Sequence, residues 1–383
     1  MIFLGEENWI IILCVLRSRL YENNILIHGE GYIMDLKIAT AEDRQKWDDL
    51  IAASDGGTLF HTLKWLECLE THTTKKLFGQ SYPGVLIPLV AREGTVIVAL
   101  LPLFLYVCPG IRLVKSGCAS DDTLYLGPVF MESGSLKPSK LQLRTIHLQK
   151  ALDNYIKNEL KANYITLRFS PFNTDARPFI WDGYTVELAH TYIHNLEKGT
   201  DAVWLGFNAG ARRDILKAQK SGLSVVQGGI EDAEFIYDTL AARNRANSSR
   251  AFVLDIVRTF FPNNCSVFIA KRNEKRLSGI IVLNYGNCAY GWIGFPKMEG
   301  DRLLVNELLM WEIIKWAHSK GCHTLENLGA DDITTFPFKR KFNPKLQPYF
   351  TVTAASFLFR SYLCLKRLIS PPRYELEEDK GGE

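Results

Sequence analysis

The sequence predicts a mixed α/β fold, in which helices cover the faces of a sheet that contains parallel and antiparallel strands. Helical and strand-like segments alternate along the chain, which is typical of layered folds with helices and a sheet. Some strands follow one another directly, because the Glu93-Gly94 turn between two apolar runs predicts an antiparallel hairpin. The order of elements also repeats in two halves, each with an early helix, an antiparallel meander, a long helix and a final strand.

The first of these halves opens after Met34. Pro138 marks the start of its long helix, in which apolar residues recur with a period near 3.6. The expected elements are, in chain order, a strand at 36–40, helices at 41–54 and 61–72, strands at 84–93, 95–107 and 112–117, a helix at 138–160 and a strand at 163–171.

The second half begins near Thr191. Gly222 and Gly321 stand where a glycine ends a helix, and Asp301 is the expected N-cap of the last long helix. The expected elements are a strand at 191–196, a helix or broken helix at 201–222, a strand at 223–229, helices at 231–247 and 253–261, strands at 266–273, 277–286 and 287–295, a helix at 301–321, and strands at 323–329 and 349–354 that flank a loop at 336–344.

Length and charge narrow the class of protein. The 383 residues fit two to three domains, and we expect an N-terminal extension at 1–33, a first domain at 34–190, a second domain at 191–356 and a C-terminal segment at 357–383. The balance of 47% hydrophobic and 23% charged residues excludes a disordered, collagen-like or disulfide-held chain. The net charge of +3 means that any nucleic-acid contact needs a local basic patch, and no DNA partner is expected.

Both ends of the chain depart from the globular pattern. The apolar run Trp9–Leu16 is too short for a bilayer span of about 20 residues, and acidic residues precede it where a signal peptide carries positive charge. We expect an extension with native translation from Met34, and a short hairpin or membrane-surface segment is the alternative. Residues 357–369 predict an amphipathic basic helix, which either packs on its own domain or contacts a membrane surface.

A basic stripe is the first candidate site. Arg213, Lys217 and Lys220 fall at helical spacings of four and three, so they share one face, while Ile215 and Leu216 can pack inward. Three cations on one face can hold the phosphates of a donor or of a nucleic acid. A solvated helix surface is the alternative interpretation.

The second candidate site is the segment 336–344, in which three phenylalanines alternate with three consecutive cations. Packing of Phe338 and Phe342 would hold Lys339 in place, which suits a cation that meets a phosphate or a developing oxyanion. A basic surface loop with aromatic anchors is the alternative. A third cluster near a helix end, with Arg243 and Arg250, could bind an anionic substrate or could be an exposed loop.

Common nucleophile and nucleotide motifs are absent. The chain has no G-x-S-x-G, no G-x-x-x-x-G-K-[ST] and no G-x-G-x-x-G at the start of a helix. No histidine or cysteine spacing indicates a metal site, and no cofactor is expected. Glu326, in a strand before Gly329, is the best candidate for a general base.

Several stretches in order resemble the Fem-type peptidyltransferases and the wider FemAB-like group of GNAT acyltransferases. The stretches are FHTLKWLECLE, VALLPLFLYV before LYLGPVF, the segment from TYIHNL to KSGLSV with its basic helix, LLMWEIIKWAHSKGCHTLENLGA, and FPFKRKFNP. They span roughly Met34 to Thr353, and the most specific is the aromatic-lysine segment after the last long helix.

The resemblance implies two tandem GNAT-like domains with a cleft between them. It implies transfer of an amino acid from aminoacyl-tRNA, or of an acyl group from acyl-CoA, to an amine of a cell-wall precursor. Phe338-Lys339 matches the Phe-Lys pair of the family near its reaction centre, and Arg243, Arg250 and Tyr290 are further substrate contacts by the same comparison. The chain lacks the long helical arm that some of these enzymes insert in the second domain, which argues against their kind of tRNA binding.

We therefore expect an N-acyltransferase that acts on a primary amine of a cell-envelope or polysaccharide precursor, which could be lipid- or nucleotide-linked. Neither long helix is preceded by a [QR]-x-x-G-x-[GA] loop, so acyl-CoA is the less favoured donor. An acyl-CoA-dependent enzyme and a non-catalytic Fem-like binding protein remain as alternatives. The eight cysteines form no C-x-x-C pair, which indicates a reducing, cytoplasmic location that could lie at the inner face of the membrane.

Overall fold

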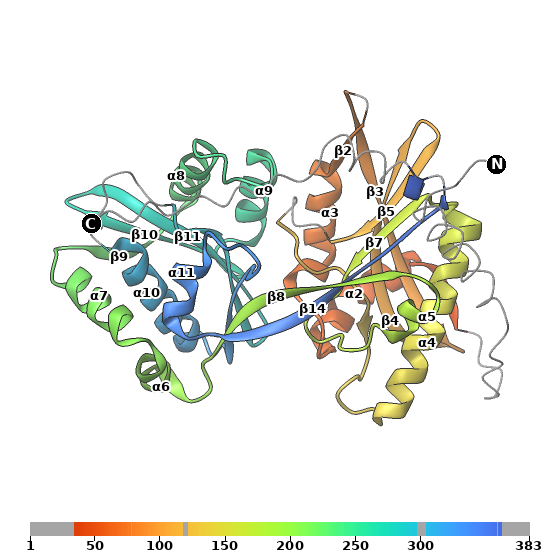
Figure 1. Ribbon diagram of the computed structural model, residues 1–383, viewed down its shortest axis with the longest axis horizontal. Coiled ribbons are helices and arrows are strands. Elements are labelled where there is room, and N and C mark those ends of the chain that lie inside the picture. Colours follow the sequence, from red (N-terminus) through yellow and green to blue (C-terminus); the bar gives the residue numbers. More distant parts are fainter. Residues whose placement is uncertain (1–33, 78, 118–121, 297–303, 358, 362–383) are drawn as a thin grey trace, which may run out of the picture.

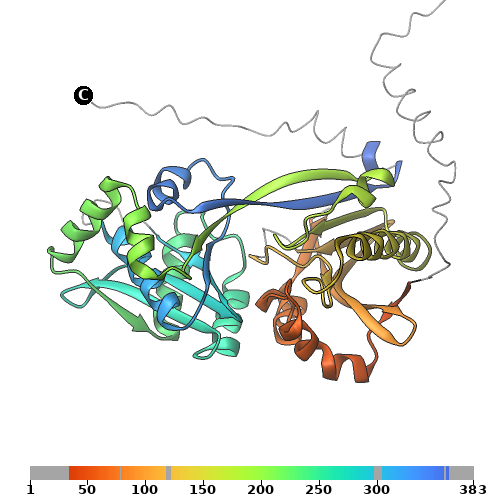
Figure 2. The same cartoon turned by 90° about the horizontal axis from the view of Figure 1, so that it is seen from below.

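The computed structural model describes residues 34–77, 79–117, 122–296, 304–357 and 359–361. The chain forms two lobes that are joined by a pair of long strands, β8 (Thr185–Asn195) and β14 (Lys345–Ala355) (Figure 1). Figure 2 shows these two strands side by side as they arch from one lobe to the other. We refer to residues 34–181 as the first half and to residues 199–342 as the second half.

In the first half, helices pack against both faces of the sheet. Leu100 of β4 packs with Leu66 of α3, whereas its neighbour Leu101 packs in the cluster that includes Leu152 of α4. Successive residues of a strand point to opposite faces, so continuous apolar strands need this double cover. The elements are β1 (Asp35–Ile38), α2 (Ala41–Ala53), a 3₁₀ turn (Leu59–His61), α3 (Leu63–His72), β2 (Thr74–Leu77), β3 (Gln80–Glu93), β4 (Val96–Cys108), β5 (Ile111–Ser116), β6 (Val129–Phe130), α4 (Pro138–Asn154) with a π turn (Tyr155–Leu160), β7 (Tyr164–Arg168) and α5 (Arg177–Trp181).

The second half repeats this arrangement. Ile281 of β11 packs with the residues of α8 and α9, and its neighbour Ile280 packs with those of α7 and α10. The elements are α6 (Gly199–Gly206), α7 (Ala209–Gln219), β9 (Ser224–Gly228), α8 (Ile230–Ala241), α9 (Arg250–Phe260), β10 (Cys265–Arg272), β11 (Lys275–Tyr285), β12 (Cys288–Gly294), α10 (Val305–Ser319), β13 (Thr324–Asn327), α11 (Phe336–Lys339) and a 3₁₀ turn (Arg340–Phe342).

The strands of the described residues join in one 14-stranded mixed sheet. Its main path runs β1-β3-β4-β5-β7-β14-β8-β13-β12-β11-β10-β9. The pairs β5–β7 and β12–β13 are parallel, and both lie at the same point of the repeated pattern. Strand β8 follows the first half in sequence but pairs with β13, while β14 follows the second half but pairs with β7. Each long strand therefore completes the sheet of the opposite half. The mixed α/β fold predicted from the sequence is confirmed.

A continuous aromatic core fills the seam between the halves. The Trp65 ring of α3 lies 5.5 Å from the Trp292 ring of β12 and 5.9 Å from the Phe252 ring of α9, measured between centroids. Phe60 of the first half contacts Tyr290 of the second at 5.4 Å. Buried aromatic side chains contribute large apolar areas, so this seam is a major source of stability.

Three expectations about elements were wrong in detail. The segment expected as a loop at 336–344 contains α11 and a 3₁₀ turn, because Pro337 is compatible with the first turn of a helix. Strand β8 begins at Thr185, earlier than expected, because its pairing with β14 extends to Thr353. The helix expected to begin at Asp301 begins at Val305 in the described part, and Asp301 itself lies outside the described residues.

The structure also bears on the expected helix at 201–222, on the domain boundary and on the ends of the chain. The segment 201–222 is a broken helix, α6 and α7, with Phe207 between them in an extended conformation. The domain boundary expected between residues 190 and 191 falls inside β8, and the division into domains stays a prediction. Residues 1–33 and most of 357–383 lie outside the described residues. Among the helices that the structure describes, none is long and apolar enough to cross a bilayer.

Candidate active site

A cavity of about 1120 Å³ lies in the second half, with Asp122 of the first half on its wall. Its walls come from the ends of the parallel strands β12 and β13, the start of α10, helix α11 and the connection between α8 and α9. Strand β12 carries an irregularity here, because Ile281 pairs with Ile293 whereas Val282 pairs with Gly291. The extra residue, Trp292, is buried in the seam, and its Nε1 donates to the Asp122 carbonyl at 2.8 Å. Bulges of this kind are frequent beside active sites.

Lys339 is a buried cation in the wall of this cavity. Its side chain is 8% exposed, and its Nζ donates to the carbonyl oxygens of Leu328 and Gly329, each at 2.6 Å. These carbonyls follow directly after β13, so the ammonium lies at the end of that strand. Burial lowers the pKa of Lys339 to about 8, while the charges of Asp332 and Glu326 favour the protonated form.

Aromatic packing fixes the helix that carries Lys339. The Phe338 ring lies 5.2 Å from the Phe342 ring and 5.3 Å from the Phe295 ring. Phe338 lines the cavity and Phe342 is fully buried. The sequence interpretation expected this anchoring of Lys339 by Phe338 and Phe342, and the contacts show how alternation of rings and cations achieves it.

The other cations that line the cavity have different partners. The Lys341 Nζ lies 2.5 Å from Glu307 and 3.6 Å from Asp214. The Arg245 guanidinium donates to the Thr334 hydroxyl at 3.0 Å. Arg243 also lines the cavity, and its side chain makes no ion pair with any residue that the structure describes. Arg243 is therefore the cation best placed to receive an anionic group of a ligand.

Glu326 and Tyr290 lie in the seam and do not line the cavity. The Glu326 Oε1 atom accepts hydrogen bonds from the Tyr125 hydroxyl and, at 2.7 Å, from the Thr191 hydroxyl. Burial raises the pKa of Glu326 to about 7, and these two hydrogen bonds and the charge of Lys339 act against that rise. The Tyr290 hydroxyl is buried as well, and burial is the main reason that its pKa is raised.

The remaining predicted residues lie outside the cavity. Arg213, Lys217 and Lys220 are exposed at α7, and Ile215 packs inward as expected. The expectation that Leu216 packs inward is wrong, because its side chain is 48% exposed on the surface of the helix. Arg250 pairs with Glu234 at 3.2 Å and with Asp238 at 2.9 Å on α8, so it fixes the packing of α8 and α9.

Asn327 is a cavity residue that sequence reasoning missed. It is 4% exposed, it lines the cavity, and its amide has one weak donor contact, to the Met310 sulfur at 4.0 Å. Because it directly follows Glu326 in β13, its side chain points to the opposite face of the sheet. The available signal was an asparagine at the end of a short strand, which alone is also typical of a turn.

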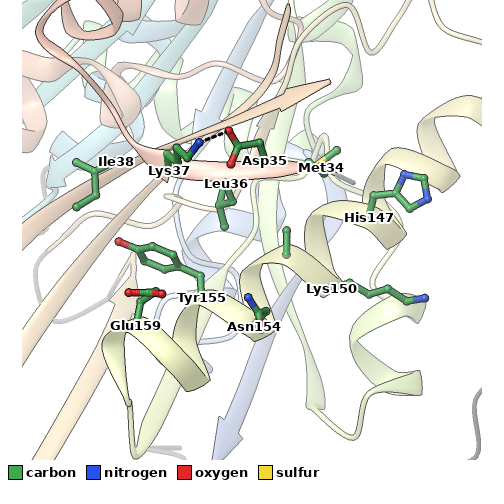
Figure 3. A pocket seen from close by; sticks show the side chains of 11 residues that line it. Met34, Asp35, Leu36, Lys37, Ile38, His147, Lys150, Asn154, Tyr155 and Glu159 are labelled. Atoms are coloured by element: carbon green, nitrogen blue, oxygen red, sulfur yellow. Dashed lines mark hydrogen bonds and ion pairs between the residues drawn. The ribbon is translucent and has the colours of Figure 1, made fainter. Parts of the chain in front are cut away.

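A second cavity of about 790 Å³ lies between the edge strand β1 and helix α4 (Figure 3). It contains none of the predicted site residues. Its charged side chains are of both signs, and Lys37 pairs with Asp35 at 2.7 Å. No group of His, Cys, Asp or Glu side chains suited to a metal ion occurs anywhere in the described ranges.

Comparison with known proteins relates part of the chain to a domain family and the whole fold to solved structures. Residues 209–340, from α7 into the turn after α11, match the family model described as an acetyltransferase (GNAT) domain. The structure is similar to that of FemX, with a TM-score of 0.58 and 13% identity over 86% of this chain and 99% of that chain. It is also similar to the C-terminal domain of a candidate lysylphosphatidylglycerol synthetase from Agrobacterium fabrum, with a TM-score of 0.51 and 12% identity over 86% of this chain and 96% of that chain.

A conserved protein of unknown function from Bacteroides thetaiotaomicron gives a TM-score of 0.51 and 10% identity over 84% of this chain and 99% of that chain. A search of curated proteins found no match. Identities this low show a likeness of fold alone. The family match and the fold together support an acyltransferase of the GNAT type.

Proposed function

We propose that the protein is a FemAB-like N-acyltransferase that transfers an aminoacyl or acyl group to a primary amine of a cell-envelope or polysaccharide precursor. The observation that carries the proposal is the buried Lys339 ammonium in the wall of the cavity. Lysine is rarely buried without a specific reason, and this one lies within the segment that matches the GNAT domain. The names of FemX and of the lysylphosphatidylglycerol synthetase support a cell-envelope acceptor for a chain of this fold.

The reaction needs positioning and charge stabilisation. The amine nitrogen of the acceptor attacks the acyl carbon, the new C–N bond forms, and the carbonyl oxygen becomes an oxyanion. Collapse of this intermediate breaks the bond to the leaving oxygen or sulfur, which takes up the proton released by the amine. Two of the three ammonium protons of Lys339 go to backbone carbonyls, which leaves one to donate to the oxyanion or to a donor phosphate.

We assign roles to the other predicted residues according to where they lie. Phe338 holds α11 and with it Lys339, and Arg243 binds an anionic group of the acceptor in the cavity. The exposed cations of α7 contact phosphates of a donor that extends beyond the cavity. In this proposal the chain is two tandem GNAT-like domains, at 34–190 and 191–356, and the acyl group is bound in the second.

The test is amide formation by purified protein with aminoacyl-tRNA or acetyl-CoA as donor and a panel of amine acceptors. Lys339→Met should lower turnover by about 100-fold or more, as removal of an oxyanion donor does in other enzymes. Lys315→Met is the matched control, because Lys315 is a half-exposed residue of α10 that pairs with Glu312 at 2.8 Å. Wild-type turnover in Lys339→Met would refute the role of Lys339. Absence of turnover with every donor would favour a binding protein.

An acyl-CoA donor is the second candidate. It is favoured by the description of the matching family as acetyltransferases and by the position of the cavity at the start of α10, where free backbone N–H groups can bind phosphate. Thermal unfolding with acetyl-CoA and with aminoacyl-tRNA distinguishes the donors, because only the bound donor raises the midpoint. Binding of tRNA should also weaken steeply with added salt, whereas a flat response would remove tRNA as the donor.

A further inference from the structure

Glu326 joins the two halves of the protein through hydrogen bonds. It lies on β13 of the second half, and its Oε1 atom accepts from the hydroxyl of Tyr125, which belongs to the first half. The same oxygen accepts from Thr191 of the connecting strand β8 at 2.7 Å. Glu326 is 4% exposed and Tyr125 is fully buried. The carboxylate therefore belongs to the seam.

The same carboxylate is linked to the cation of the cavity. Strand β13 ends one residue after Glu326, and the next two residues, Leu328 and Gly329, hold the Lys339 ammonium through their carbonyl oxygens. A shift of β13 would move these carbonyls and Lys339 with them. Glu326 also provides a negative charge that stabilises the ammonium.

We propose that Glu326 is a positioning residue for Lys339, held in place by Tyr125, and that it does not act as a general base. This proposal rests on the proposed function in one respect only, namely that a displaced Lys339 would change the rate of acyl transfer. Glu326 does not line the cavity, and its Oε1 atom accepts from the seam hydroxyls of Tyr125 and Thr191, so the structure does not place it in direct contact with an acceptor amine. Instead, it fixes the end of β13 and supplies the buried counter-charge of the ammonium.

The polar and titratable groups around the pair come from several strands, from α11 and from the connections beside them. Facing Glu326 are Tyr125 after β5, Thr191 on β8, Cys288 and Tyr290 on β12, Tyr349 on β14 and Lys339 on α11. Facing Lys339 are Glu326 and Asp332. Lys339 is the cation of this set, and it counteracts the rise that burial causes in the pKa of Glu326. Removal of the Glu326 charge should therefore lower the pKa of Lys339 further, below about 8.

The experiment measures the titration of Lys339 directly, by NMR of protein labelled with ¹³C at the lysine side chains. Lys339→Arg assigns the signal. Glu326→Gln should lower the midpoint of Lys339 by about one pH unit or more, because a neighbouring opposite charge is lost. Tyr125→Phe should change the midpoint of Lys339 in the same direction by a smaller amount. The matched control is Tyr184→Phe, which removes a buried hydroxyl that donates to Asp153 of α4 at 3.2 Å.

An unchanged Lys339 midpoint in Glu326→Gln would overturn the proposal. If acyl transfer is established, Glu326→Gln should shift the alkaline decline of the rate to lower pH, in step with the midpoint of Lys339. Loss of turnover at every pH, with Lys339 titrating as in the wild type, would show a general base. The NMR result does not depend on finding the substrates, so it decides the proposal even if the proposed function fails. If Glu326→Gln does not fold, the comparison of Tyr125→Phe with Tyr184→Phe decides.

Discussion

The ammonium of Lys341 lies 2.5 Å from the carboxylate of Glu307, at the first turn of α10. Lys341 and Lys339 are two residues apart in sequence, yet their surroundings differ. Lys341 contacts carboxylates on two helices, whereas the hydrogen bonds of Lys339 go to backbone carbonyls. A carboxylate partner cancels the positive charge, and a carbonyl partner does not. Of these two lysines, Lys339 is therefore the one whose ammonium is not paired directly with a carboxylate.

The first prediction concerns stability and follows from this difference. Lys341→Met should lower the free energy of unfolding by about 1–3 kcal/mol, because it leaves the carboxylates of Glu307 and Asp214 without their partner. Urea unfolding at pH 7 measures the change. The matched variant Lys315→Met removes a more exposed pair and should change stability less. Equal stability of Lys341→Met and wild type would show that the pair contributes nothing.

The second prediction compares two arginines at the α8–α9 connection. Arg243→Ala should raise the KM for an anionic acceptor by about tenfold with little change in kcat, because one charge-assisted contact is lost. Arg250→Ala should leave KM unchanged, because Arg250 pairs with Glu234 and Asp238 outside the cavity. Steady-state kinetics of both variants is the measurement. An effect of Arg250 on KM larger than that of Arg243 would contradict this assignment.

The third prediction concerns acid stability. Burial lowers the pKa of both His61 and His194 to about 4 in the folded protein, well below the usual value near 6.5. The unfolded chain therefore binds more protons between these pH values, so stability should be full above pH 6.5 and should fall as the pH drops toward 4. Each histidine can contribute a loss of about 3 kcal/mol over this window.

Urea unfolding at pH 7 and at pH 5 tests this linkage. His194 is the better residue to replace, because its Nε2 atom is buried and has no hydrogen-bond partner among the residues that the structure describes. His194→Phe should reduce the loss between the two pH values, since phenylalanine cannot take up a proton. His147→Phe, at a half-buried position on α4, is the control and should keep the loss of the wild type. If His194→Phe and wild type lose the same free energy, His194 does not contribute.

The fourth prediction tests the seam. Trp65→Ala should lower the free energy of unfolding by about 3–5 kcal/mol, because the Trp65 ring is fully buried against aromatic side chains of both halves. Because the halves share this core, the wild type should unfold in a single transition when followed by fluorescence and by circular dichroism. Two separate transitions in the wild type would show that the halves fold independently.

Periodicity and turn signals predicted most of the helices and strands, and also the repeat of their order. They succeeded because alternation of apolar residues and glycine or proline breaks act over a few residues. The segment 336–344 was misjudged as a loop because a single helical turn is too short to show periodicity. The anchoring of Lys339 by Phe338 and Phe342 was nevertheless predictable, since rings and cations alternate in that segment.

The direction of the Glu326 side chain could not be predicted from local sequence patterns. A carboxylate in a strand beside a lysine-bearing segment suggested a general base, but its side chain points into the seam and hydrogen-bonds to Tyr125, about 200 residues earlier in the chain. Asn327, the next residue, points into the cavity. Which of two neighbouring side chains meets a ligand depends on which face of β13 the cavity occupies.

By itself, the sequence determined the class of fold, the repeated order of elements and the segment that carries the buried lysine, because these depend on local patterns of apolar, aromatic and turn-forming residues. The tertiary structure decided that β8 and β14 each complete the sheet of the opposite half, and that Lys339, Arg243 and Asn327 share one cavity while Glu326 does not. The physical reason is that strand pairing and the direction of a side chain are set by contacts between residues far apart in the chain.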